Sequence, residues 1–200
     1  MSAPAWSAYD DGYLRAHQWA GALAGGAQLP QEATTSQLGP GEVAHAHFAP
    51  VGVAGYFGEN KDASSSLFLI GGPVGLAVTG AASIAHNAKK RRDAERAAVP
   101  RWHNLGSADL VVTSQRLVVT GNGRTGSFWY AEAGPLQLVV GPGGAPAVQF
   151  QPSGAPVLRL ESAYAPMLYV FVHYLVDGRP PEVPLPAGLL ERAKAQGRLA

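Results

Sequence analysis

The chain of 200 residues contains no cysteine, so disulfide-stapled folds, thiolate zinc sites and cysteine nucleophiles are excluded. Charge is also scarce. Only 14% of the residues are charged, and 15 basic against 14 acidic side chains give a formal net charge of +1. So balanced a charge argues against a protein whose whole surface binds nucleic acid. Hydrophobic residues make up 46% of the chain, which is enough to bury a core and excludes wholesale disorder.

Catalytic motifs are missing as well. The serines at 64–66 lie in no Gly-x-Ser-x-Gly nucleophile elbow. The glycine-rich stretch 141–144 is followed neither by Lys and Ser/Thr nor by the start of a helix, which a phosphate-binding loop requires. We therefore expect that the protein is not an enzyme and that it uses no cofactor and no small-molecule substrate.

The N-terminal region lacks the uninterrupted apolar stretch of a secretory signal, because Asp10, Asp11 and Arg15 fall within it. We therefore expect the protein in the cytoplasm or at the cytoplasmic face of a membrane. Aromatic residues at three- and four-residue spacing predict a helix over 5–24. That helix belongs to a lead-in, 1–40, which we expect to be loosely ordered.

Short β-type runs separated by turn residues follow Trp102. Their spacing of roughly ten residues predicts an antiparallel barrel or sandwich. The earlier stretch 42–57 alternates in the same way, although Pro50 interrupts it, and its second half either continues the strand or forms its hairpin partner. An apolar helix is predicted over 163–176, and a proline-rich tail with a short helix over 179–200. The six runs are 109–113, 116–120, 127–131, 136–140, 147–151 and 157–161.

Several of these runs carry the pattern of a known family. Trp102 and the sequence GSADLVVTSQRLVV at 106–119 resemble the tryptophan and hairpin of bacterial pleckstrin-homology-like (PH-like) and GRAM-like proteins. SFWY at 127–130 resembles the aromatic strand that follows in those proteins. LRL at 158–160, with APM at 165–167, resembles their last strand and the start of the capping helix.

This resemblance implies a mainly β (α+β) fold over 41–178, a PH-like antiparallel barrel with a C-terminal capping helix. Such barrels have seven strands, so 42–57 would supply the first, and 67–99 would be an inserted Ala/Gly-rich helix. The resemblance also implies a scaffold that binds lipid, peptide or protein, since PH-like barrels are commonly binding modules. The basic loop typical of phosphoinositide-binding members is missing, because the turn at 121–126 carries only Arg124.

The stretch 67–85 holds nineteen residues without a charge, which is long enough to cross a hydrocarbon core of roughly 30 Å. Its glycines and Pro73 make a weak helix, so an element buried in or docked on the barrel satisfies the same composition. An interfacial segment is a third reading. A single span also meets a topological objection: if 42–57 pairs with the later strands, both flanks of the span lie on one side of the membrane.

A basic run follows directly. We expect it to attract anionic lipid headgroups or a membrane protein, at about 1 kcal/mol per side chain near a charged surface. The alternative is a solvated helix face in which Asp93 and Glu95 lie close to the basic groups. No nucleic-acid motif accompanies the run. The candidate binding residues are Lys89, Lys90, Arg91, Arg92, Arg96 and Arg101.

Two further patterns favour structural roles. His45 and His47 would face the same side of a strand, but a metal needs a third ligand and only distant histidines are available, so we expect no metal site. The distant histidines are His86, His103 and His173.

An apolar and aromatic stripe at i, i+3, i+4 and i+7 lies on one face of the helix predicted over 163–176. We expect this stripe to seal the core, and the alternative is a ligand groove beside the helix. Its residues are Met167, Val170, Phe171 and Tyr174.

The sequence therefore predicts a non-catalytic binding or scaffolding module of PH-like type at the cytoplasmic membrane face, which contacts anionic lipid or a membrane protein. The alternative is a soluble protein-interaction or assembly module without membrane contact, in which 67–85 is core or a subunit interface. Both readings leave a homo-oligomer open, and neither involves nucleic acid.

Overall fold

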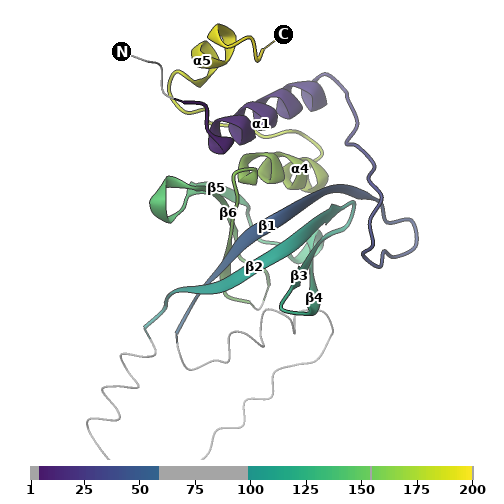
Figure 1. The fold of residues 1–200 in the computed structure, drawn as a ribbon. Coiled ribbons are helices and arrows are strands. Elements are labelled where there is room, and N and C mark those ends of the chain that lie inside the picture. The colour runs from purple at the N-terminus through teal and green to yellow at the C-terminus, as the bar shows by residue number, and fades with distance from the viewer. Residues whose placement is uncertain (1–4, 59–98, 154, 200) are drawn as a thin grey trace, which may run out of the picture.

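Seven strands form one antiparallel sheet in the order β4-β3-β2-β1-β7-β6-β5, and the described residues also form three helices (Figure 1). The computed structural model describes residues 5–58, 99–153 and 155–199. The predicted mixed, mainly β class is confirmed. The strands are β1 Ala44–Phe57, β2 Arg101–Thr113, β3 Arg116–Gly121, β4 Arg124–Trp129, β5 Gln137–Val140, β6 Pro146–Phe150 and β7 Val157–Glu161. The helices are α1 Ala8–Ala24, α4 Ala165–Asp177 and α5 Leu189–Ala195, with 3-10 turns η1 Tyr130–Glu132 and η2 Pro142–Gly144.

The sheet is not closed into the expected barrel. Within the described residues, β4 pairs only with β3 and β5 pairs only with β6, so both remain edge strands. The connection between them explains the opening. After β4 the chain turns into η1, and Gly134 N–H then donates to Gln151 O instead of extending β4. β5 is only four residues long, and all four of its residues pair with β6.

β1 runs as one strand through Pro50, so the second half of 42–57 continues the strand and does not form its hairpin partner. The Ala49–Pro50 peptide bond is cis, and the register with β2 shifts between Phe48 and Val51. The first half of β1 pairs with β2, and the second half pairs with both β2 and β7. β1 is therefore the central strand on which the two halves of the sheet meet.

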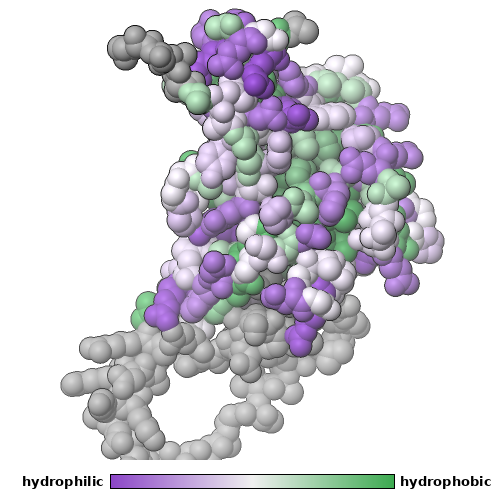
Figure 2. Space-filling view, viewed as in Figure 1, coloured by the Kyte–Doolittle hydropathy of each residue, from purple (hydrophilic) through white to green (hydrophobic). Residues whose placement is uncertain are grey.

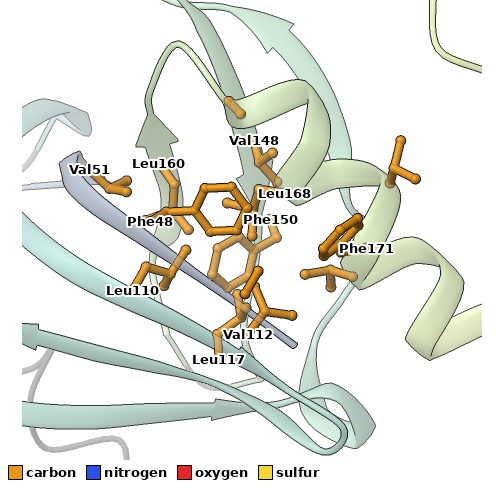
Figure 3. Close-up of a cluster of buried hydrophobic side chains, with 14 of the residues drawn as sticks. Phe48, Val51, Leu110, Val112, Leu117, Val148, Phe150, Leu160, Leu168 and Phe171 are labelled. Atoms are coloured by element: carbon orange, nitrogen blue, oxygen red, sulfur yellow. The ribbon is translucent and has the colours of Figure 1, made fainter. Parts of the chain in front are cut away.

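The core lies between the sheet and α4 (Figure 3). Large apolar side chains from five strands meet Leu168 and Phe171 of the helix, each 1% exposed. In the predicted stripe, Val170 and Phe171 are buried while Met167 and Tyr174 pack partly buried against them, so the sealing role is confirmed. The strand residues labelled in Figure 3 are Phe48, Val51, Leu110, Val112, Leu117, Val148, Phe150 and Leu160.

The predicted N-terminal helix is present as α1, and it packs on the far side of α4 (Figure 1). Ser7 accepts a hydrogen bond from Asp10 N–H and Asp10 accepts one from Ser7 N–H, which is a capping box. Ala16 and Leu23 are buried in the core, and the Trp19 ring meets Phe171 edge-on at 5.2 Å between centroids. From α1 onward, the segment expected to be a loose lead-in thus forms a layer of the packed molecule.

The apolar stretch 67–85 and most of the inserted segment 67–99 lie outside the described residues. Among the helices that are described, none is long and apolar enough to cross a membrane.

Candidate functional site

Two exposed aromatic rings and one arginine lie together on the outer face of the sheet. Side chains alternate along β7, and Leu158 and Leu160 face the core, so Arg159 between them faces outward. In the ladder, Tyr56 pairs with Trp102. Their ring centroids lie 5.4 Å apart, and the Arg159 guanidinium carbon lies 4.1 Å from the centre of the Trp102 ring. We call Tyr56, Trp102 and Arg159 the aromatic patch.

The aromatic patch is held rigidly and yet remains accessible. Arg159 is only 9% exposed, and its Nε donates to Glu161 Oε1 at 2.7 Å, so the guanidinium is fixed between a carboxylate and an indole. Tyr56 and Trp102 keep 41% and 36% of their surface exposed. Large amphipathic rings that are exposed in this way suit a surface that contacts a partly apolar partner.

The patch borders the end of the β1–β2 hairpin. Phe57 is paired with Arg101 there, and the Phe57 ring stacks on His103 at 4.1 Å between centroids. Arg101 is the one predicted basic site residue that the structure describes, and it directly precedes Trp102 in β2. The other predicted residues, Lys89, Lys90, Arg91, Arg92 and Arg96, lie outside the described residues.

The histidines do not converge on a metal site. His45 Nδ1 lies 2.7 Å from Pro30 O, and His103 Nε2 lies 3.0 Å from Phe57 O. His173 Nδ1 is 3.0 Å from Asp177 Oδ2, and His47 is exposed. The described part of the chain contains no group of three metal-ligating side chains. His86 lies outside it.

A second arginine–tryptophan pair serves the fold. The Arg116 guanidinium carbon lies 4.8 Å from the centre of the Trp129 ring, and its Nε donates to Glu42 Oε1 at 2.9 Å. Glu42 also accepts from Thr113 Oγ1 at 2.6 Å and from Gly39 N–H at 2.7 Å. These bonds fasten the chain before β1 to the β2–β3 hairpin.

The pKa of Glu42 is consistent with this structural role. Burial of Glu42 raises its pKa, but the hydrogen bonds from Arg116, Gly39 and Thr113, with the positive charge of Arg116, outweigh burial. Together they lower the pKa from 4.5 to about 2. Glu42 therefore stays ionised at neutral pH, and its oxygens are occupied as acceptors within the protein.

Sequence reasoning did not find the aromatic patch, because its members come from three strands. In the sequence, Trp102 belongs to the family pattern, Tyr56 lies in the predicted strand 42–57, and Arg159 lies in the run 157–161. The usable signal is the alternation in VLRLE, which places Arg159 on the opposite face of the strand from the two leucines.

No family, curated protein or solved structure matches this chain.

Proposed function

We propose that the chain is a non-catalytic binding module of PH-like type that docks at the cytoplasmic face of a membrane through anionic lipid or a membrane protein. The aromatic patch beside Arg101, at the end of the β1–β2 hairpin, carries this proposal. Trp and Tyr favour the boundary between water and lipid, because one part of each ring system is apolar and another forms hydrogen bonds. Arg101, which is exposed and directly precedes Trp102, adds a positive charge that attracts anionic headgroups.

The arrangement of strands supports the PH-like part of the proposal. β1 supplies the seventh strand that the resemblance required, each strand pairs antiparallel with its neighbours, and α4 follows β7 to cover the core. The opening between β4 and β5 is the feature in which the sheet departs from a closed PH-like barrel.

Strand pairing also favours surface docking over a single membrane span. Phe57 pairs with Arg101, so the chain leaves and re-enters the sheet at adjacent positions. Both flanks of 67–85 therefore begin on the same side of any membrane, and one crossing cannot satisfy that constraint. The basic run at 89–92 follows 67–85 in the sequence and would add attraction to an anionic surface.

The alternative is a soluble protein-interaction or assembly module without membrane contact. The same exposed rings favour it, because Tyr and Trp are enriched at protein interfaces and arginine stacks with them there. The dependence of binding on ionic strength distinguishes the membrane-docking module from the soluble module. Attraction to anionic lipid weakens as salt screens the charges, whereas an apolar interface keeps its strength.

The test is co-sedimentation of the full chain with phosphatidylcholine vesicles, with and without phosphatidylserine, at low and physiological salt. We expect binding only with phosphatidylserine, weakened by salt. Trp102→Ala should weaken it about tenfold. Trp129→Ala is the matched control, because Trp129 is 39% exposed and also stacks with an arginine, yet lies in β4. Neutralising 89–92 to glutamine should cost about 100-fold or more.

Other outcomes contradict the membrane proposal. If the full chain never sediments with either vesicle, docking through anionic lipid is wrong, and a membrane protein or the soluble module replaces it. If binding resists salt and the neutralised variant binds normally, the basic residues are not the attachment. If Trp102→Ala and Trp129→Ala behave alike, the aromatic patch is not the contact surface.

A further inference from the structure

A groove of about 570 Å³ runs along α1 on the side that meets the C-terminal residues. It lies at the helical end of the molecule, where α1 stands between α4 and α5 (Figure 1). Hydrophilic residues gather over this end on the face shown in Figure 2. Most of the lining comes from one face of α1, at the spacing of successive helical turns. The lining residues are Asp11, Leu14, Arg15, Gln18, Trp19, Ala22 and Arg198.

Two guanidinium groups share one carboxylate in this groove. Arg15 Nε donates to Asp11 Oδ2 at 2.7 Å, and Arg198 Nη1 lies 3.9 Å from Asp11 Oδ1. Tyr164 also donates its hydroxyl to Asp11 Oδ2, at 3.4 Å. The side chains of Arg15 and Arg198 are 57% and 43% exposed. The groove thus carries one uncompensated positive charge at its solvent-facing rim.

Both arginines are oriented by contacts that leave donors for a ligand. Arg15 reaches Asp11 through Nε, so its two Nη groups keep their N–H bonds for an added acceptor. Arg198 donates from Nε to Gln196 at 3.3 Å, and its guanidinium carbon lies 4.5 Å from the centre of the Trp6 ring. Paired Nη donors match the geometry of a carboxylate.

The rest of the groove lining combines the apolar side chains of Leu14, Trp19 and Ala22 with the polar Gln18. Leu14 is 4% exposed, and Trp19 is held by its edge-on contact with Phe171. Ala22, one turn further along α1, is exposed. The groove is open to solvent, unlike the enclosed cavities that bury small molecules.

We propose that this groove binds an acidic segment of a partner protein. A carboxylate of the segment would accept from Arg15 and Arg198, and a neighbouring apolar side chain would cover Leu14, Trp19 and Ala22. Charge complementarity carries the choice of partner, since the net positive rim selects Asp and Glu, and the apolar floor selects a large side chain beside them. The proposal is independent of vesicle binding.

The test is selection of peptides from a random display library on the immobilised full chain, in parallel with the double variant Arg15→Gln/Arg198→Gln. The wild type should enrich peptides in which Asp or Glu stands next to Leu, Phe or Trp, whereas the double variant should not. A synthetic peptide from the enriched pool should lose about tenfold or more in affinity on the double variant. It should also shift the Trp19 indole N–H resonance of labelled protein.

Arg124→Gln is the matched control, because it removes one exposed positive charge at the β3–β4 turn. It should leave peptide affinity unchanged, and circular dichroism should show that all variants are folded. The proposal is overturned if both selections give pools of the same composition, or if the peptide binds the double variant as tightly as the wild type. Replacing the acidic residues of the peptide by amides must abolish binding. Retention of binding would show that charge does not select the ligand.

Discussion

Glu42, which has no exposed side-chain surface, accepts four hydrogen bonds from Gly39, Thr113 and Arg116. Glu42→Gln removes its charge and leaves Arg116, with 17% of its side chain exposed, without an ionic partner. Breaking a buried pair in this way costs about 3 kcal/mol of unfolding free energy. Urea denaturation at neutral pH measures the loss. Adding Arg116→Gln should restore part of it, and a loss below about 0.5 kcal/mol would mean that the pair does not fasten the segment.

The dependence of the unfolding free energy on pH tests the role of Glu42 independently. Its folded-state pKa of about 2 lies below the unfolded value of 4.5, so its contribution is complete above pH 4.5 and is lost as pH falls toward 2. We expect the wild type to lose about 3 kcal/mol more than Glu42→Gln across that interval. Equal loss in both proteins would contradict the low pKa.

At the residue scale, the sequence predicts which side of a helix or strand a residue occupies better than it predicts which distant residue that residue contacts. The stripe predicted over 167–174 correctly places Phe171 in the core. Glu42 and Arg116 are 74 positions apart, and nothing in the local pattern marks them as a pair. Long-range pairs of this kind depend on sheet topology, which composition and periodicity do not fix.

At the element scale, the fit of α1 depends on one glycine. A Cβ atom at Gly12 would lie 1.9 Å from Ala163 O, which is backbone that cannot move aside cheaply. A Cβ atom at Gly21, in the same helix, would meet nothing within 4 Å. We expect Gly21→Ala to stabilise the protein by about 0.5–1 kcal/mol, through helix propensity alone. Gly12→Ala gains the same propensity but should lose about 1–3 kcal/mol net through overpacking.

Thermal or urea unfolding of the two variants isolates the clash, because both substitutions occur in α1. If Gly12→Ala is as stable as Gly21→Ala, α1 does not dock as closely against Ala163 as the structure shows. Loss of stability in both variants would instead indicate that propensity does not dominate at Gly21.

Most elements could be predicted because their signals are local. All six later strands and the helices α1, α4 and α5 occur close to their expected positions. The first half of β2 was missed, since 101–108 mixes polar residues with a left-handed Gly106 at φ 97° and has no clean alternation. The docking of α1 on α4 was also missed, because it depends on which apolar faces remain uncovered once the sheet has formed.

At the scale of the whole molecule, the two proposed surfaces lie at opposite ends. The aromatic patch borders the end of the β1–β2 hairpin, whereas the groove lies beyond α4, beside α1 and α5 (Figure 1). The two surfaces share no residue and no element, so their binding free energies should add. A module with these two surfaces would bind a membrane at one end and an acidic segment of a partner protein at the other.

Independence of the two ends can be measured directly. We expect the affinity of the selected acidic peptide to change by less than about twofold when the protein is saturated with phosphatidylserine vesicles, since distant sites add within about 0.5 kcal/mol. Repulsion between the peptide and the vesicle should be small at physiological salt, where the screening length is about 8 Å. Fluorescence anisotropy of labelled peptide provides the readout, with phosphatidylcholine vesicles as control. A change of about tenfold would instead reveal coupling through α4, which is the element that separates the sheet from α1.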